Sequence, residues 1–124
     1  MMDTVCKIVR PEEVSQQDTL EQDDPEILCR ACGHSITHPD HRILKADSFS
    51  HTFANPYGHV FEIGCFSKAP GCVTASPASD EFSWFKGYVW AVAVCSRCAS
   101  QLGWRFSSGA DTFYGLILDQ LIFP

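Results

Sequence analysis

Residues 88–98 read YVWAVAVCSRC and carry the strongest structural signal in the chain. The first eight are aromatic, β-branched or small, and the length of this run suits a strand buried on both faces better than a helix. The last four place Cys95 and Cys98 in a C-x-x-C pair, a spacing that turns two thiolates toward one ion. The stretch therefore predicts a strand that ends at one half of a metal site.

The other half of this site is predicted near residue 30. Residues 29–34 read CRACGH, so Cys29 and Cys32 form a second C-x-x-C pair, and Gly33 helps the chain to turn behind it. Two such pairs complete the four-sulfur tetrahedron that structural zinc prefers, and this closed shell leaves no position for a catalytic water. We therefore predict a structural Zn²⁺ site. Two unrelated thiol pairs or a redox C-x-x-C are the alternatives.

Three further cysteines lie outside these pairs. Cys6 belongs to an acidic N-terminal segment, whereas Cys65 and Cys72 flank a loop with Pro and Gly and have the character of buried small apolar residues. A nucleophilic cysteine needs a base beside it, and the sequence supplies none by spacing. We assign these cysteines no catalytic role.

The remaining pattern predicts a mainly β, single-domain fold. A Pro-Gly turn at 55–58 separates extended stretches, and a segment rich in Pro, Gly and Ser at 68–79 reads as a loop. A three-residue loop at 85–87 predicts a hairpin in which Trp84 lies opposite Tyr88 and Phe82 lies opposite Trp90. At most a turn or two of helix is expected, at 96–102. Strands are predicted at 43–46, 59–63, 81–84, 88–95, 104–106 and 113–123.

Charge and hydropathy exclude several classes of protein. Residues 1–26 hold eight of the fifteen acidic residues, which predicts a disordered tail before a domain at 27–124. The domain is neutral and has no Lys/Arg stripe, so nucleic-acid binding is not expected. The sequence shows neither a signal peptide nor an apolar run long enough to span a bilayer, and we expect a soluble, cytoplasmic protein.

Three tryptophans, Trp84, Trp90 and Trp104, lie within a short part of the sequence. Aromatic residues on strands usually pack in the core. Three indoles from different strand positions can instead wall a pocket for a flat or compact ligand. Spacing alone leaves both readings open.

Several longer motifs occur together: FSWFKGYVW at 82–90 and CSRCASQLGWRF at 95–106, with CRAC at 29–32, NPYG at 55–58 and FYGL at 113–116. In combination they resemble the thalidomide-binding (CULT) domain of cereblon. The resemblance extends from about Leu28 to the C-terminus. The resemblance implies a β-tent, in which two antiparallel sheets are pinned at one end by a Cys₄ zinc site.

The resemblance also implies a ligand and its pocket. Trp84, Trp90 and Trp104 would form the cage, with Phe106 closing one side. The N–H and carbonyl of a glutarimide would pair with the main-chain carbonyl of Phe82 and the main-chain N–H of Trp84, and the loop Asn55-Pro56-Tyr57 would contact whatever projects from the ring. Implied ligands are glutarimide, thalidomide-type compounds, proteins ending in a cyclic imide, and uracil-like rings.

This sequence departs from the family pattern at several points. Histidine occupies the positions of Tyr57 and Phe82 in the human family member, so the pocket rim is expected to differ in selectivity. No Lon-like domain and no segment for docking a ubiquitin-ligase adaptor is recognised. The chain therefore resembles a stand-alone, bacterial-type homologue, for which we expect binding rather than catalysis.

Two alternative functions remain open at this point. Zinc-bearing methionine sulfoxide reductases also carry two C-x-x-C pairs, but they need a nucleophilic cysteine in a late strand, and no cysteine follows Cys98. A cage for methylated ammonium groups would act through cation–π contacts, with Asp80 and Glu81 close in sequence. The histidines after the first pair, His34, His38 and His41, are given no role.

Overall fold

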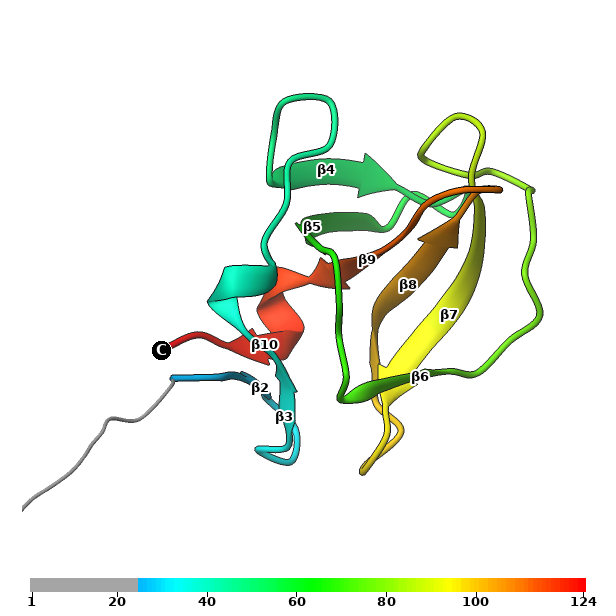
Figure 1. The fold of residues 1–124 in the computed structure, drawn as a ribbon. Helices are drawn as coiled ribbons and strands as arrows, with labels where there is room; N and C mark the ends of the chain where they lie inside the picture. Colours follow the sequence, from blue (N-terminus) through cyan, green and yellow to red (C-terminus); the bar gives the residue numbers. More distant parts are fainter. Residues whose placement is uncertain (1–24) are drawn as a thin grey trace, which may run out of the picture.

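The computed structural model describes residues 25–124, and these form two antiparallel sheets (Figure 1). The larger sheet has the strand order β4-β5-β9-β8-β7-β6, and the smaller has the order β10-β2-β3. The prediction of a mainly β fold with two antiparallel sheets is confirmed. The tail predicted for residues 1–26 lies almost wholly outside the described residues and stays a prediction.

The strands are short and joined mostly by turns. The larger sheet contains β4 (Ser50–Ala54), β5 (Val60–Phe66), β6 (Cys72–Thr74), β7 (Val89–Cys95), β8 (Gln101–Ser107) and β9 (Thr112–Ile117). The smaller sheet contains β2 (Ile27–Cys29), β3 (Ser35–Thr37) and β10 (Leu121–Ile122), and two 3₁₀ turns are η1 (Pro39–His41) and η2 (Leu118–Gln120). Neither helical segment in residues 25–124 has the length and hydropathy needed to cross a membrane.

Strand β7 follows the predicted segment closely but is not equally buried on its two faces. Ala91, Ala93 and Cys95 are buried, whereas Trp90 and Val92 between them are half-buried. Small residues on the inner face let the neighbouring core approach the strand closely. The outer face carries the larger side chains, which leaves them free to line a surface cavity.

The predicted strand at 81–84 is wrong. Trp90 exchanges both main-chain hydrogen bonds with Ser79, at 2.8 Å each, so its main chain cannot also pair with Phe82. Residues 80–87 instead form turns, and Phe82 takes a φ of +56°, which is unusual for a residue with a side chain. The loop contacts the end of β4, where the indole N–H of Trp84 donates to the carbonyl of Ala54.

Four smaller predictions also fail. The segment 68–79, read as a loop, contains β6, and the single strand predicted at 113–123 is interrupted by η2. Residues 43–46 form no strand, because Lys45 and Ser48 pair with each other across a tight turn in which Ala46 and Asp47 have positive φ values. Residues 96–102 form no helix, because a turn is followed by β8 from Gln101.

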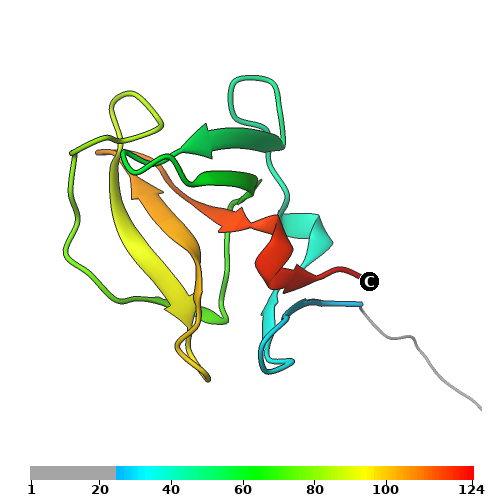
Figure 2. The same ribbon diagram turned by 180° about the vertical axis from the view of Figure 1, so that it is seen from behind.

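The two sheets meet at Gly71. Its N–H donates to the carbonyl of Ile36 and its carbonyl accepts from the N–H of Ser96, each at 2.9 Å. A Cβ at this position would lie 2.2 Å from the carbonyl oxygen of Ser35, so only glycine allows this approach. Figure 2 shows the small sheet beside the turn that joins β7 to β8.

A partly exposed ion pair ties the 43–49 loop to the larger sheet. Lys45 Nζ lies 2.5 Å from Asp111 Oδ2, and the hydroxyl of Tyr88 donates to the same oxygen at 2.6 Å. The ammonium also lies over the rings of Tyr88 and Phe113, 5.5 and 4.7 Å from their centroids. In this cluster the Lys45 ammonium is held by one carboxylate and by the faces of two aromatic rings.

We expect Lys45→Met to lower the free energy of unfolding by about 1 kcal/mol, a shift in melting midpoint of roughly 4–8 °C. The partners lower the pKa of Asp111 and raise the pKa of Lys45, in each case mainly through their shared hydrogen bond. The stabilisation is therefore complete at neutral pH and is lost as the pH falls below the ordinary pKa of Asp111 of 3.8. Thermal melts at pH 7 and pH 3 test this.

The matched control for this prediction is Lys86→Met, because Lys86 is exposed and forms no ion pair within residues 25–124. A difference between Lys45→Met and wild type that persists unchanged at pH 3 would contradict the assignment to Asp111.

Candidate metal site and aromatic pocket

The four predicted cysteines come together where the two sheets meet. The Sγ atoms of Cys29, Cys32, Cys95 and Cys98 all lie within 4.8 Å of one another. The Cys29–Cys98 and Cys32–Cys95 sulfurs are 3.7 and 3.6 Å apart. A tetrahedral ion with metal–sulfur bonds of about 2.3 Å requires sulfurs roughly 3.8 Å apart, whereas a disulfide requires about 2.05 Å. The cluster therefore could hold a metal ion and contains no disulfide.

Hydrogen bonds from the surrounding chain reach both sulfurs of the second pair. In the first pair, a main-chain hydrogen bond from His34 lowers the pKa of Cys32, but burial and the neighbouring thiols outweigh it and raise this pKa to about 11. The N–H of Arg97 donates to Cys95 Sγ at 3.4 Å. Ser100 Oγ lies 3.3 Å from Cys98 Sγ, and hydrogen bonds from the hydroxyl and the main chain of Ser100 lower the pKa of Cys98 to about 6. Thiolates are the form that binds metal, so the donor set suits a metal ion. Gly33 takes a φ of +79°, which is the turn that its place behind the first pair predicted.

Neither of the other described cysteines has the features of a nucleophile. Cys65 is fully buried and Cys72 nearly so. Burial raises the pKa of Cys65 to about 11 and that of Cys72 to about 12. Both side chains therefore stay protonated and pack as small apolar groups, as the sequence predicted.

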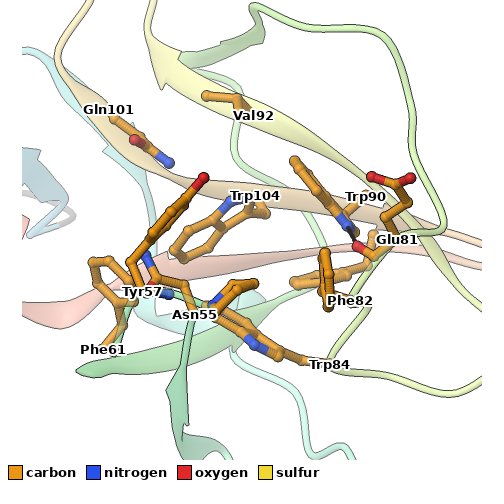
Figure 3. Close-up of a pocket in the computed structure, with 12 residues that line it drawn as sticks. Asn55, Tyr57, Phe61, Glu81, Phe82, Trp84, Trp90, Val92, Gln101 and Trp104 are labelled. Atoms are coloured by element: carbon orange, nitrogen blue, oxygen red, sulfur yellow. Dashed lines mark hydrogen bonds between the residues drawn. The ribbon is translucent and has the colours of Figure 1, made fainter. Parts of the chain in front are cut away.

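A pocket of about 540 Å³ opens on the larger sheet (Figure 3). The three tryptophans line it, with Trp90 on β7, Trp104 on β8 and Trp84 on the loop between β6 and β7. The other five residues predicted for the site also line it: Asn55, Pro56, Tyr57, Phe82 and Phe106. Phe106 is only 1% exposed and forms the floor, whereas Tyr57 and Phe82 are 88% and 73% exposed and form the rim.

Two of the indoles meet in a corner that hydrogen bonds hold in place. The ring centroids of Trp84 and Trp104 are 4.7 Å apart at an interplanar angle of 74°. The indole N–H of Trp84 donates to the carbonyl of Ala54 at 3.2 Å. Trp90 has no ring contact with either indole within residues 25–124, and its N–H donates to the carbonyl of Glu81 at 2.7 Å. A flat ring can therefore enter between Trp90 and the corner.

In the described part of the chain, two main-chain groups belonging to residues that line the pocket have no hydrogen-bond partner. Within residues 25–124, neither the carbonyl oxygen of Phe82 nor the N–H of Trp84 forms a hydrogen bond. The Asn55 side chain is used within its own loop, because its Oδ1 accepts from the N–H groups of Tyr57 and His59 at 2.9 Å each. Asn55 thus shapes the turn that presents Tyr57 to the pocket.

Several lining residues were not predicted for an imide pocket. Among residues 25–124, Val92 and Gln101 also line it, and so does Glu81, which the sequence analysis named only beside a possible ammonium cage and which is the one charged lining residue. Phe61 lines it from β5, and Phe53 stacks behind Trp84 with centroids 4.9 Å apart. Because side chains alternate between the two faces of a strand, Val92 could have been predicted to line the pocket from its position two residues after Trp90 on β7. Phe53 and Phe61 could not be found this way, because they reach the tryptophans only through the pairing of β4 with β5.

The fold and the two sites define a class of protein: a small two-sheet β-domain with a four-cysteine cluster and an aromatic pocket. Comparison with curated proteins gives this class a name. Cereblon of Danio rerio is 35% identical over 103 residues, which are 77% of this chain and 24% of that protein. Cereblon of Gallus gallus is 32% identical over 75 residues, 56% of this chain, and cereblon of Xenopus tropicalis is 38% identical over 69 residues, 52% of this chain.

The chain is a cereblon-like (CULT) domain, as its motifs predicted. It spans about a quarter or less of the length of the cereblons it matches, with shares of 24%, 17% and 15% in the three cereblons compared above. No family model matches the chain.

Proposed function

We propose that this domain is a binding module that holds a flat cyclic imide in the pocket walled by Trp84, Trp90 and Trp104. The observation that carries the proposal is the pairing of an aromatic corner with the unpartnered Phe82 carbonyl and Trp84 N–H. An imide edge offers an N–H beside a carbonyl, which is the complement of these two groups. A desolvated imide must recover these hydrogen bonds, so the edge selects imides over apolar rings.

The ligand class follows from the shape and charge of the pocket. A volume of about 540 Å³ exceeds that of one six-membered ring, which leaves room for an attached group at the exposed Tyr57 and Phe82 rim. Glutarimide, thalidomide-type compounds, uracil-like rings and proteins with a C-terminal cyclic imide all present the required edge. With Glu81 as the one charged lining residue, anionic ligands are disfavoured.

We infer that the four cysteines bind structural Zn²⁺ and that the domain is not an enzyme. Zinc prefers four thiolates in a closed tetrahedron, and the sulfur spacings of 3.6 and 3.7 Å suit it. Reduction of methionine sulfoxide would need an accessible nucleophilic cysteine, and burial of Cys65 and Cys72 argues against that role. Unpaired cysteines with a thiolate-bound metal fit a reducing compartment such as the cytoplasm.

Trp90→Ala is expected to weaken glutarimide binding roughly 30-fold, about 2 kcal/mol, because it removes the wall opposite the corner. Trp90 is chosen because it is half-buried and, unlike Trp84, forms no stacked or edge-on ring pair within residues 25–124, although it packs against the core cluster around Phe106. Isothermal titration calorimetry of the zinc-loaded protein measures the effect, with Val73→Ala as the control at an exposed site away from the pocket. A wild-type protein that takes up no glutarimide would contradict the proposal.

A cage for methylated ammonium is the second candidate, because Glu81 brings a carboxylate to the pocket wall. The two candidates differ in their response to Glu81→Gln. Binding of a neutral imide is expected to change less than about threefold in this variant, because its partners are main-chain groups. Tetramethylammonium should bind wild type more weakly than glutarimide does. Tighter binding of tetramethylammonium, lost in Glu81→Gln, would favour the ammonium cage.

A further inference from the structure

His34 connects the two cysteine knuckles. The first knuckle comprises residues 29–34 and begins at the last residue of β2, and the second comprises residues 95–100 and begins at the last residue of β7. Its ring nitrogen Nε2 lies 3.1 Å from the hydroxyl oxygen of Ser96. Among residues 25–124, this is the one hydrogen bond between the knuckles that does not involve a sulfur atom. A half-buried histidine and an exposed serine from different sheets therefore meet beside the four sulfurs.

Both ends of this bond are attached to fixed main chain. The carbonyl of His34 accepts from the N–H of Cys29 at 2.8 Å, and its amide lies against the Cys32 sulfur. Ser96 directly follows Cys95, and its N–H donates to the carbonyl of Gly71 at 2.9 Å. Because each residue is attached to its own knuckle, the side-chain bond links the two knuckles directly, in addition to the main-chain bridge through Gly71.

We propose that His34 is a positioning residue of the metal site, whose bond to Ser96 holds the second knuckle where all four sulfurs can enclose one ion. The hydroxyl can donate to an unprotonated Nε2 or accept from Nε2–H, so either tautomer maintains the link. A bound ion would be lost through detachment of one sulfur, and Cys98 is the exposed member of the four. With the His34–Ser96 bond in place, the second knuckle would keep a detached Cys98 close enough to bind again.

The rate of zinc release tests this proposal and does not depend on the imide ligand. The Zn²⁺-loaded protein is mixed with an excess of a chromogenic chelator, and zinc transfer is followed by absorbance. His34→Ala and Ser96→Ala are each expected to release zinc roughly 10-fold faster than wild type, the usual effect of losing an outer-shell partner. The double variant should be no faster than either single variant, because both remove the same bond.

Two further variants exclude a general loss of structure. His59→Ala removes an exposed imidazole far from the sulfurs and should release zinc at the wild-type rate. His34→Gln restores a hydrogen-bonding group and should slow release again, while Ser96→Ala, at an exposed position, remains informative if His34→Ala folds poorly. Wild-type release rates in both single variants, effects that multiply in the double variant, or a protein that takes up no Zn²⁺ would each overturn the proposal.

Discussion

Removal of the metal from the four-cysteine cluster is expected to abolish cooperative folding of the domain. The small sheet consists of strands of two or three residues, which cannot stay folded without support from a neighbouring element. That support comes from the knuckles and from the contact at Gly71. A structural zinc contributes on the order of 10 kcal/mol, comparable with the whole stability of a domain of about 100 residues.

Circular-dichroism melts of the zinc-loaded and the chelated protein measure this effect. Metal content is determined before and after chelation, and the transition should return when Zn²⁺ is added back. Cys98→Ala should reproduce the loss, and since Cys98 is exposed and belongs to neither core cluster, a packing defect cannot explain it. An unchanged melting midpoint after verified removal of the metal would refute the prediction.

Gly71→Ala is expected to have the next largest effect, a loss of about 3 kcal/mol or more in the free energy of unfolding. The added Cβ would lie 2.2 Å from the Ser35 carbonyl oxygen and 2.6 Å from the Ile36 Cα, both main-chain atoms that no side-chain rotation can move away. The sheets would have to separate, which breaks the 2.9 Å hydrogen bond from the Gly71 N–H to the Ile36 carbonyl.

Gly109→Ala is the matched control, because a Cβ there meets no atom within 4 Å and the φ of Gly109 is not positive. Urea unfolding of the two zinc-loaded variants gives the comparison. If Gly71→Ala unfolds at the same urea concentration as Gly109→Ala, the sheets do not depend on their contact at residue 71.

Local patterns in the sequence predicted the elements whose partners are close or chemically distinctive. The run of aromatic and β-branched residues at 88–95 became β7, and the two C-x-x-C pairs became one cluster whose sulfurs all lie within 4.8 Å of one another. The hairpin at 81–84 failed because Ser79, from a segment read as a loop, takes both hydrogen bonds of Trp90. Hydrophobic periodicity does not indicate which of two nearby segments forms the main-chain hydrogen bonds with a given strand.

The pocket was predictable only in part for the same reason. The three tryptophans lie near one another in sequence, but spacing alone left open whether they were core or pocket, and the family motifs decided it. Phe53 packs against Trp84 across about thirty residues of sequence, through the register of β4 against β5. The positive φ of Phe82 could not be predicted from the sequence either, because the surrounding loop imposes it and phenylalanine does not favour it.

The pairing of β2 with β10 places the two ends of the domain side by side. Leu28 lies opposite Ile122, so the chain enters and leaves through neighbouring strands of the small sheet (Figure 1). The loops that carry Tyr57 and Phe82 lie on the other side of the molecule, on the larger sheet. Domains with adjacent ends tolerate insertion into a host loop or fusion at both ends. This domain could therefore be built into another polypeptide, for example as an imide-responsive sensor between two fluorescent proteins, with its pocket still open to solvent.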